Sequence, residues 1–227
     1  MCGRYSVVID EAKLRKQFAR QLTLPEGGLR QDYNMAPTKS GLVITNKQPN
    51  QLSQFRWGLV PFWAKDLKIG ARMINARSEG IEDKASFRKP IREKRCLILA
   101  DSFYEWQRRG KEKQPYRIHR SNDDLLVMAG IWESWRPKDD PDGNPVYTYS
   151  IITGAPNEEM TPIHDRMPML LTTEEAQSTW LSTDTALPDV LDLLRTPPNG
   201  TLEYYPVSAV VGNVRNNGPE LHEPVSE

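Results

Sequence analysis

The chain has 227 residues, of which 38% are hydrophobic, and its 30 Lys and Arg balance its 30 Asp and Glu. This composition fits one large domain or two small ones with a true core, and no apolar run approaches the roughly 18 residues of a membrane span. The N-terminus lacks a signal-peptide apolar region, and two cysteines do not make a disulfide framework. We therefore expect a cytoplasmic protein. Because its few histidines and cysteines lack ligand spacing, we expect no metal and no cofactor.

Hydrophobic periodicity predicts short strands and helices in irregular order. A strand over residues 4–9 leads into a helix over 11–22, and residues 23–40 follow as a loop. Further strands are expected at 42–45, 54–60, 96–106, 115–120, 125–132, 147–153, 167–172 and 202–208, and helices near 86–94, 157–162, 174–181 and 188–195. The acidic, turn-rich segment 136–145 is typical of an exposed loop. This irregular mixture predicts a single α+β domain.

The zero net charge hides a strong asymmetry along the chain. Residues 1–120 hold 25 Lys and Arg against 12 Asp and Glu, whereas residues 121–227 hold 5 against 18. A basic half of this kind favours a polyanionic partner, and nucleic acid is the usual one. The alternative is that the two halves interleave in the fold and neutralise each other.

Cys2 directly follows the initiator Met1, so removal of Met1 would leave an α-amine and a thiol on adjacent carbons. Such a 1,2-aminothiol captures aldehydes, because the amine forms a Schiff base and the thiol then closes a five-membered thiazolidine. The ordinary pKa values, about 7.7–8.0 for the amine and about 8.5 for the thiol, leave both groups partly nucleophilic near neutrality. The alternative is that position 2 simply tolerates any small residue.

Two further residues are candidates for acid–base chemistry. Glu105 lies between aromatic residues at the end of an apolar strand, where a carboxyl group tends to have a raised pKa and to donate a proton near neutral pH. His164 lies in a loop between Pro162 and Pro168, and histidine is well suited to move protons near neutrality. Asp165 is adjacent in sequence, so we expect its side chain to diverge from His164.

Other side chains are candidates for binding a nucleic acid. Asn75 and Arg77 would share one face of an extended segment, where an amide and a guanidinium could hold a sugar hydroxyl and a phosphate. Several other arginines could extend this anion track: Arg4, Arg72, Arg88 and Arg166. Phe62 and Trp63 follow a proline and are expected to project and stack on bases, whereas Trp57 is expected in the core.

Seven segments of this chain together resemble the SRAP family, the SOS-response-associated peptidases also known as abasic-site processing proteins. The segments follow the family's order: CGRY, NMAPT, RWGLVPFW, INARSE, RCLILADSFYEW, IHDRMP and YPVS. The resemblance extends from Cys2 to about Asn213, and only the acidic loop 136–145 and the last residues fall outside it. We accordingly expect an SRAP domain over residues 1–213 and a C-terminal tail over 214–227.

The resemblance implies a single compact α+β domain with a curved, barrel-like mixed β-structure, flanking helices and a basic cleft for single-stranded DNA. It also implies that Met1 is removed autocatalytically and that Cys2 crosslinks to the ring-opened aldehyde of an abasic site. Asn75 would position Cys2, Glu105 would assist ring opening, and His164 would move protons. Arg4, Arg77 and Arg166 match phosphate-gripping positions, and Trp63 and Trp106 match positions near the lesion. Many relatives have two tryptophans where this chain has Phe62 and Trp63, which puts the strength of stacking in doubt.

The function expected from this resemblance is covalent protection of abasic sites in single-stranded DNA by a monomeric protein, with weak lyase activity as a by-product. Two alternatives stay open at this stage. One is a cysteine peptidase that cleaves other proteins with Cys2, His164 and Glu105. The other is a non-catalytic binding module for single-stranded or modified DNA, in which Cys2 is incidental.

Overall fold

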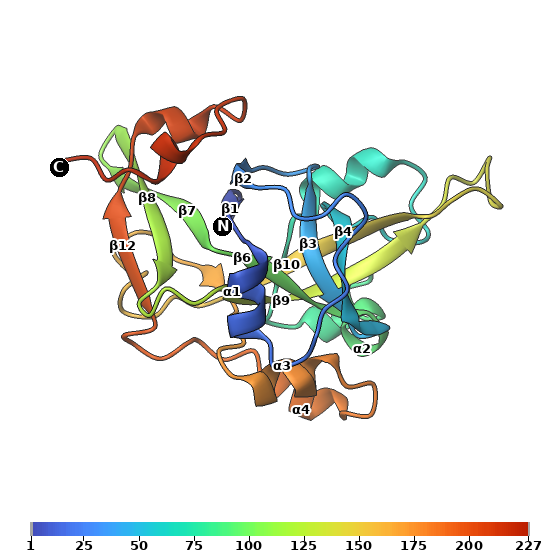
Figure 1. The fold of residues 1–227 in the computed structure, drawn as a ribbon. Helices are drawn as coiled ribbons and strands as arrows, with labels where there is room; N and C mark the ends of the chain where they lie inside the picture. The colour runs from blue at the N-terminus through green and yellow to red at the C-terminus, as the bar shows by residue number, and fades with distance from the viewer. Residues whose placement is uncertain (1, 227) are drawn as a thin grey trace.

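The computed structural model of the protein describes residues 2–226, whose strands form two sheets (Figure 1). The first sheet has five strands, in the order β12–β8–β7–β1–β2. Their bounds are β1 Tyr5–Val7, β2 Asp32–Met35, β7 Ser102–Arg109, β8 Glu112–Arg120 and β12 Leu202–Pro206. Each of its described pairings is antiparallel, including the β7–β8 hairpin that turns through Gly110 in the left-handed region of φ.

The second sheet has seven strands and closes on itself. The strands are β3 Ser40–Thr45, β4 Gln48–Trp57, β5 Asn75–Arg77, β6 Arg95–Ala100, β9 Leu126–Trp135, β10 Val146–Gly154 and β11 Met167–Pro168. Strand β10 pairs with β4 in parallel and with β9 in antiparallel fashion, so the path β10–β4–β3–β6–β9 returns to β10 as a barrel. Strand β5 adds to β10 in parallel and β11 adds to it in antiparallel fashion. This arrangement confirms the expected α+β fold with a curved, mixed β-structure.

The main core fills this barrel and the space between it and the flanking elements. All six residues of β6 are buried, because one face of the strand lines the barrel and α3 (Glu174–Leu181) packs against it from outside. Trp57 is fully buried, as expected, and its ring contacts Tyr5 of the first sheet at a centroid distance of 5.0 Å. The Tyr5 and Tyr149 hydroxyls are also hydrogen-bonded, so the two sheets share one core.

The helices are short and cover the barrel ends. They are α1 Glu11–Gln17, α2 Pro90–Glu93, α3 and α4 Leu187–Asp192, with 3₁₀ turns η1 Leu67–Arg72, η2 Ile81–Asp83, η3 Ala209–Gly212 and η4 Pro219–His222. The side chain of Asp10 caps α1 and that of Thr173 caps α3, each accepting a bond from a first-turn backbone N–H. In the part of the chain that the structure describes, none of these helices is long and apolar enough to cross a membrane.

Several predicted elements differ from the structure. The helix expected over 86–94 is confined to α2, and the strand expected over 167–172 is confined to β11. The helix expected over 11–22 ends at Gln17, because Phe18 and the residues after it turn away to pair Thr23 with Gln51. The loop expected over 23–40 contains β2. The helix expected over 157–162 is a set of turns. Met160 N donates a hydrogen bond to the side chain of Asn157, and Pro162 has no N–H to continue a helix.

The single strand expected over 96–106 is two strands in different sheets. The chain bends at Asp101, which is buried and accepts hydrogen bonds from Val8 N at 2.6 Å, Ser6 Oγ at 3.0 Å and Arg117 Nη2 at 3.0 Å. Strand β6 therefore stays in the barrel while β7 joins β1. The acidic segment 136–145 forms the expected exposed loop, between β9 and β10 (Figure 1).

The last residues of the chain pack on the five-stranded sheet. Leu221 is fully buried beside Tyr104, and Val225 N donates to Pro206 O at 3.0 Å. Figure 1 shows this red segment beside β7 and β8, and η4 contacts β2. The expected boundary near residue 213 stays a prediction.

Candidate functional site

Cys2 lies fully buried where the N-terminus runs alongside β7. Tyr5 of β1 faces Phe103, and Tyr104 N donates to Arg4 O at 2.9 Å. Because the two strands are antiparallel, Cys2, three residues before Tyr5, lies beside the part of β7 that carries Glu105 and Trp106. Strand β1, with the sequence YSV, is buried along its whole length and so fixes the path of the preceding residues, including Cys2, beside β7.

Asn75 links this N-terminal segment to the barrel. Its Nδ2 donates to Cys2 O at 2.8 Å. Asn75 begins β5, whose register opposite Ile151 is fixed by β10, and the side chain of Trp57 donates to the neighbouring Ile74 O at 2.9 Å. Within residues 2–226, the buried Oδ1 of Asn75 accepts no hydrogen bond, so this amide has acceptor capacity for a bound molecule.

Glu105 and His164 face each other on the other side of Cys2. Glu105 is 4% exposed, and its Oε2 lies 3.9 Å from His164 Nε2. The loop that carries His164 is held to β7, because Gln107 Nε2 donates to Pro162 O at 2.9 Å. The structure thus brings together all four residues that the sequence indicated for chemistry: Cys2, Asn75, Glu105 and His164.

Burial controls the electrostatics of this group. The pKa of Glu105 is raised, because burial disfavours its charged form more than the nearby His164 favours it. Burial also raises the pKa of the Cys2 thiol well above its ordinary value, and the negative charge of Glu105 adds to the effect. The thiol is therefore protonated at neutral pH in this environment, and Glu105 is a carboxyl group suited to hold a proton.

His164 is oriented by its own loop. Arg166 N donates to His164 Nδ1 at 3.1 Å, which leaves Nε2 to carry the proton that faces Glu105. Asp165 Oδ1 lies 2.8 Å from the same Nδ1, an alternative partner that requires Nδ1 to carry a proton and to donate it, in place of accepting from Arg166 N. The expectation that the Asp165 side chain diverges was wrong, because the tight turn between Pro162 and Pro168 folds it back over the ring.

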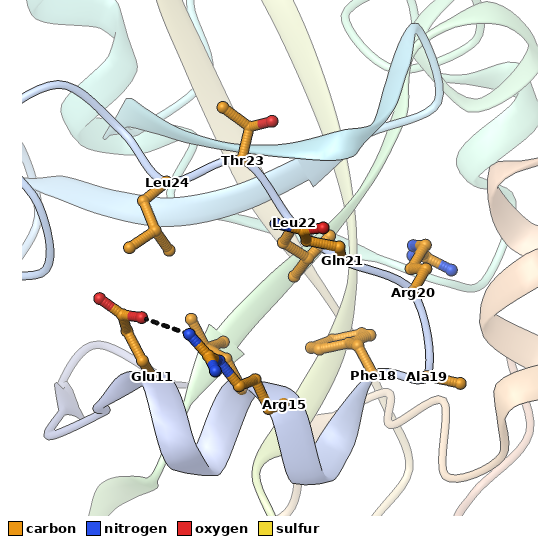
Figure 2. Close-up of a pocket in the computed structure, with 10 residues that line it drawn as sticks. Glu11, Arg15, Phe18, Ala19, Arg20, Gln21, Leu22, Thr23 and Leu24 are labelled. Carbon is orange, nitrogen blue, oxygen red and sulfur yellow. Dashed lines mark hydrogen bonds and ion pairs between the residues drawn. The ribbon is translucent and has the colours of Figure 1, made fainter.

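A hollow of about 720 Å³ opens beside this group. Its walls come from the end of β7 and from the 156–165 loop, and they include Trp106, Ile163 and His164. A second hollow, of about 650 Å³, lies between α1 and residues 18–24 (Figure 2). It contains none of the residues indicated for chemistry, and its charged groups include an Arg15–Glu11 ion pair.

The arginines expected to grip phosphates fall into two classes. Arg77 and Arg88 are exposed. Arg4 instead donates through Nη1 to Asn34 Oδ1 at 2.7 Å and to Val211 O at 2.8 Å. Arg166 has a side chain only 13% exposed and binds both carboxylate oxygens of Glu79, at 2.8 and 3.1 Å.

The aromatic residues are placed as the sequence indicated. Phe62 and Trp63 are 59% and 45% exposed, while Trp57 is buried. Trp106 is half-buried, with the Arg4 guanidinium 5.9 Å from its ring centroid. Among residues 2–226, no group of three or more His, Cys, Asp and Glu side chains could hold a metal ion.

Sequence reasoning missed two residues that support this site. Glu79 pairs with Arg166, and Asn34 holds Arg4. A signal was present for each: Glu79 lies in INARSE with Arg77, and Asn34 lies in NMAPT. Pairing across 87 and 30 positions of sequence could not be assigned from spacing alone.

Comparisons of the sequence with protein families and with known proteins indicate one family. A profile of the family described as SOS response associated peptidase (SRAP) matches residues 1–214. The chain is 46% identical over 226 residues to the abasic site processing protein YoqW of Bacillus subtilis (strain 168), covering 98% of this chain and 99% of that protein. It is 36% identical over 266 residues to the abasic site processing protein HMCES of Gallus gallus, covering 99% of this chain and 78% of that one.

The fold gives the same result. A crystal structure of a protein from Bacteroides thetaiotaomicron superposes with a TM-score of 0.87 at 27% identity, over 99% of this chain and 100% of that chain. A profile match over nearly the whole length, together with full-length relatives, leaves one assignment. The chain belongs to the SRAP family.

Proposed function

We propose that this protein processes abasic sites in single-stranded DNA by capturing them covalently through Cys2. The observation that carries the proposal is the convergence of Cys2, Asn75, Glu105 and His164 at one junction of the two sheets. Its relatives YoqW and HMCES are named as abasic site processing proteins, which supports the same substrate. An abasic sugar is a masked aldehyde, and an N-terminal cysteine is a reagent for aldehydes.

The reaction requires removal of Met1, because the nitrogen of Cys2 is an amide while Met1 is attached. Hydrolysis of the Met1–Cys2 bond consumes one water and frees the α-amine. The family's description as a peptidase fits this self-cleavage. Cleavage by a separate aminopeptidase would yield the same N-terminus.

Capture then proceeds in two bond-forming steps. The sugar opens from hemiacetal to aldehyde, the Cys2 amine adds to the carbonyl carbon, and loss of one water gives an imine. The thiol next adds to the imine carbon, and its proton passes to the imine nitrogen, which closes the thiazolidine. The net change is one C–N and one C–S bond formed, with one water released.

Each neighbouring side chain has a place in these steps. Asn75 holds the Cys2 carbonyl, so the amine and thiol are presented in one orientation. Protonated Glu105 donates to the ring oxygen during opening, which its raised pKa favours near neutral pH. His164 faces Glu105 and exchanges protons with it. An imine that does not close permits β-elimination of the strand, which gives weak lyase activity.

The exposed groups bind the strand. Arg77 and Arg88 contact phosphates, and Phe62 and Trp63 stack on bases that flank the lesion. Trp106 lines the hollow beside His164 and contacts the sugar. Arg4 and Arg166 are held by internal partners, Asn34 and Glu79, and we assign them to phosphate contact on the family resemblance.

Intact mass spectrometry tests the proposal directly. Purified protein is measured before and after incubation with a uracil-containing single-stranded oligonucleotide that uracil glycosylase has treated. We expect loss of Met1 and then a gain equal to the oligonucleotide minus one water. Protein that lacks Met1 but gains no mass refutes the capture.

The variant Cys2→Ser separates capture from its alternatives. It keeps an N-terminal amine and a hydroxyl, so DNA binding persists while the adduct that resists denaturation is lost. A binding module would show no difference between the two proteins. A peptidase acting on other proteins would lose cleavage of a protein substrate instead.

A further inference from the structure

Asn34 lies at the centre of a polar network that joins the C-terminal part of the chain to the N-terminal segment bearing Cys2. Asn34 is fully buried in β2. Its Nδ2 lies within hydrogen-bond distance of three carbonyl oxygens: Val211 O at 3.2 Å, Asn213 O at 3.0 Å and Asn216 O at 2.8 Å. We call residues 209–217 the C-terminal strap. One side-chain amide thus contacts three backbone carbonyls of this strap.

The same amide fixes Arg4, two residues after Cys2. Asn34 Oδ1 accepts from Arg4 Nη1 at 2.7 Å, and the same Nη1 donates to Val211 O at 2.8 Å. The backbone carbonyl of Arg4 accepts from Tyr104 N at 2.9 Å and lies 3.9 Å from Cys2 Sγ. Both ends of Arg4 are therefore held, its side chain by the strap and its backbone by β7.

The strap is tied to β2 by further bonds. Asn217 Oδ1 accepts from Tyr33 N at 2.7 Å, and Tyr104 Oη donates to Tyr33 O at 2.9 Å. The Arg4 guanidinium also lies over the ring of Trp106, which lines the hollow beside His164. The strap, β2 and β7 thereby enclose Arg4 on three sides.

We propose that Asn34 and the C-terminal strap position Cys2 for ring closure. This inference rests on the proposed function. Closure needs the thiol to reach the imine carbon from a fixed direction, and a terminal residue is free to swing unless the strand behind it is anchored. Asn75 holds the carbonyl of Cys2, Gly3 contributes no side chain, and Arg4 is the next anchored residue, which Asn34 orients. Asn34 is a positioning residue: it acts through Arg4.

The ratio of products formed from the imine distinguishes a loss of Cys2 positioning from a general loss of protein stability. An imine either closes to the thiazolidine, eliminates to a cleaved strand, or is reduced by cyanoborohydride to a stable amine. Misplacement of the thiol slows only the first of these. We therefore expect Asn34→Ala to lower the ratio of thiazolidine to cleaved plus reduction-trapped product by roughly tenfold or more, a ratio that does not depend on how tightly the variant binds the DNA.

Asn46→Ala is the matched control. Asn46 is also a buried amide, with Nδ2 donating to Glu93 O at 2.9 Å and Oδ1 accepting from Trp132 Nε1 at 3.1 Å. Its loss lowers the melting temperature but should leave the partition at the wild-type value. Asn217→Ala is a milder second variant, since Asn217 is exposed and only its bond to Tyr33 N is removed. It tests the strap if Asn34→Ala does not fold.

The outcomes distinguish this inference from the function on which it rests. Failure of the wild-type protein to form any adduct overturns the proposed function. If the wild-type protein forms adducts, a shifted partition in Asn34→Ala or Asn217→Ala supports positioning by the strap. Partition ratios in both variants equal to that of Asn46→Ala overturn the inference.

Discussion

Replacement of Asn75 by alanine removes one defined contact of the proposed reaction. The side chain donates to Cys2 O at 2.8 Å, across the junction of the two sheets. The backbone of β5 does not depend on it, since Ile151 N donates to Ile74 O at 3.0 Å and Ser78 N donates to Thr153 O at 2.9 Å. The variant therefore loses the link to Cys2 while keeping the strand.

The size of the effect follows from burial. Cys2 is fully buried, so loss of the donor leaves its carbonyl without this bond in a site that water reaches poorly. An unsatisfied buried acceptor costs about 1–3 kcal/mol. Since about 1.4 kcal/mol is a factor of ten, the rate of capture should fall about five- to 150-fold if this contact is maintained in the transition state. Asn75→Asp should fall further, because a carboxylate would oppose the carbonyl.

Single-turnover capture, followed by denaturing gel electrophoresis at saturating protein, measures this rate. Gln177→Ala is the control, because Gln177 is also a buried amide whose Nε2 donates to a backbone carbonyl, Leu171 O at 2.9 Å. It should lose stability without losing rate. A wild-type rate in Asn75→Asp, or equal rate losses in Asn75→Ala and Gln177→Ala, would show that the Asn75–Cys2 bond has no part in the chemistry.

Three other outcomes follow from the structure. Glu105→Gln should slow capture by about 100-fold or more and flatten its pH profile. Burial raises the pKa of Glu105, so ring opening by the wild-type protein should weaken as pH rises through that pKa. A pH profile that is the same in the variant would exclude Glu105 as the acid. Phe62→Ala with Trp63→Ala should weaken binding of single-stranded DNA by about 1–3 kcal/mol per lost base stack, measured by fluorescence anisotropy, while the melting temperature stays unchanged because both rings are exposed. Lys94→Ala should leave the buried carboxylate of Glu133 without its cationic partner, which costs about 3 kcal/mol and lowers the melting temperature by about 6–12 °C in calorimetry. An unaltered melting temperature would mean that the Glu133 carboxylate is stabilised without Lys94.

Three of the four residues indicated for chemistry have a local signature in the sequence, and Asn75 was indicated for chemistry by the family resemblance. Cys2 is next to the initiator, Glu105 follows an apolar strand, and His164 lies between prolines. The sequence patterns did not predict that these four residues lie close together. Asn75 reaches Cys2 across 73 positions only because β5 pairs with β10 and β1 pairs with β7.

The split between β6 and β7 shows why the fold was harder to predict than the site. Residues 96–106 are mostly apolar apart from Asp101, Ser102 and Glu105, and the hydrophobic pattern predicts one strand. The break depends on Asp101, whose carboxylate is held by Val8 and Arg117, residues 93 and 16 positions away. Such long-range polar bonds leave no periodic trace, so the assignment of two sheets required the structure.

The environment of Cys2 implies an order for the two nucleophiles. Burial raises the pKa of the thiol far above neutral pH, and the charge of Glu105 raises it further. In the proposed reaction the free α-amine, whose ordinary pKa is about 7.7–8.0, is the group that is nucleophilic first, so imine formation would precede attack by sulfur. A protonated imine is cationic and lies beside Glu105, which stabilises it once the carboxyl has given up its proton to the sugar. The thiol then adds to an activated carbon and needs no prior ionisation. In the proposed reaction the buried thiol meets an electrophile only when a substrate is already bound to the amine, which favours the thiazolidine as its product.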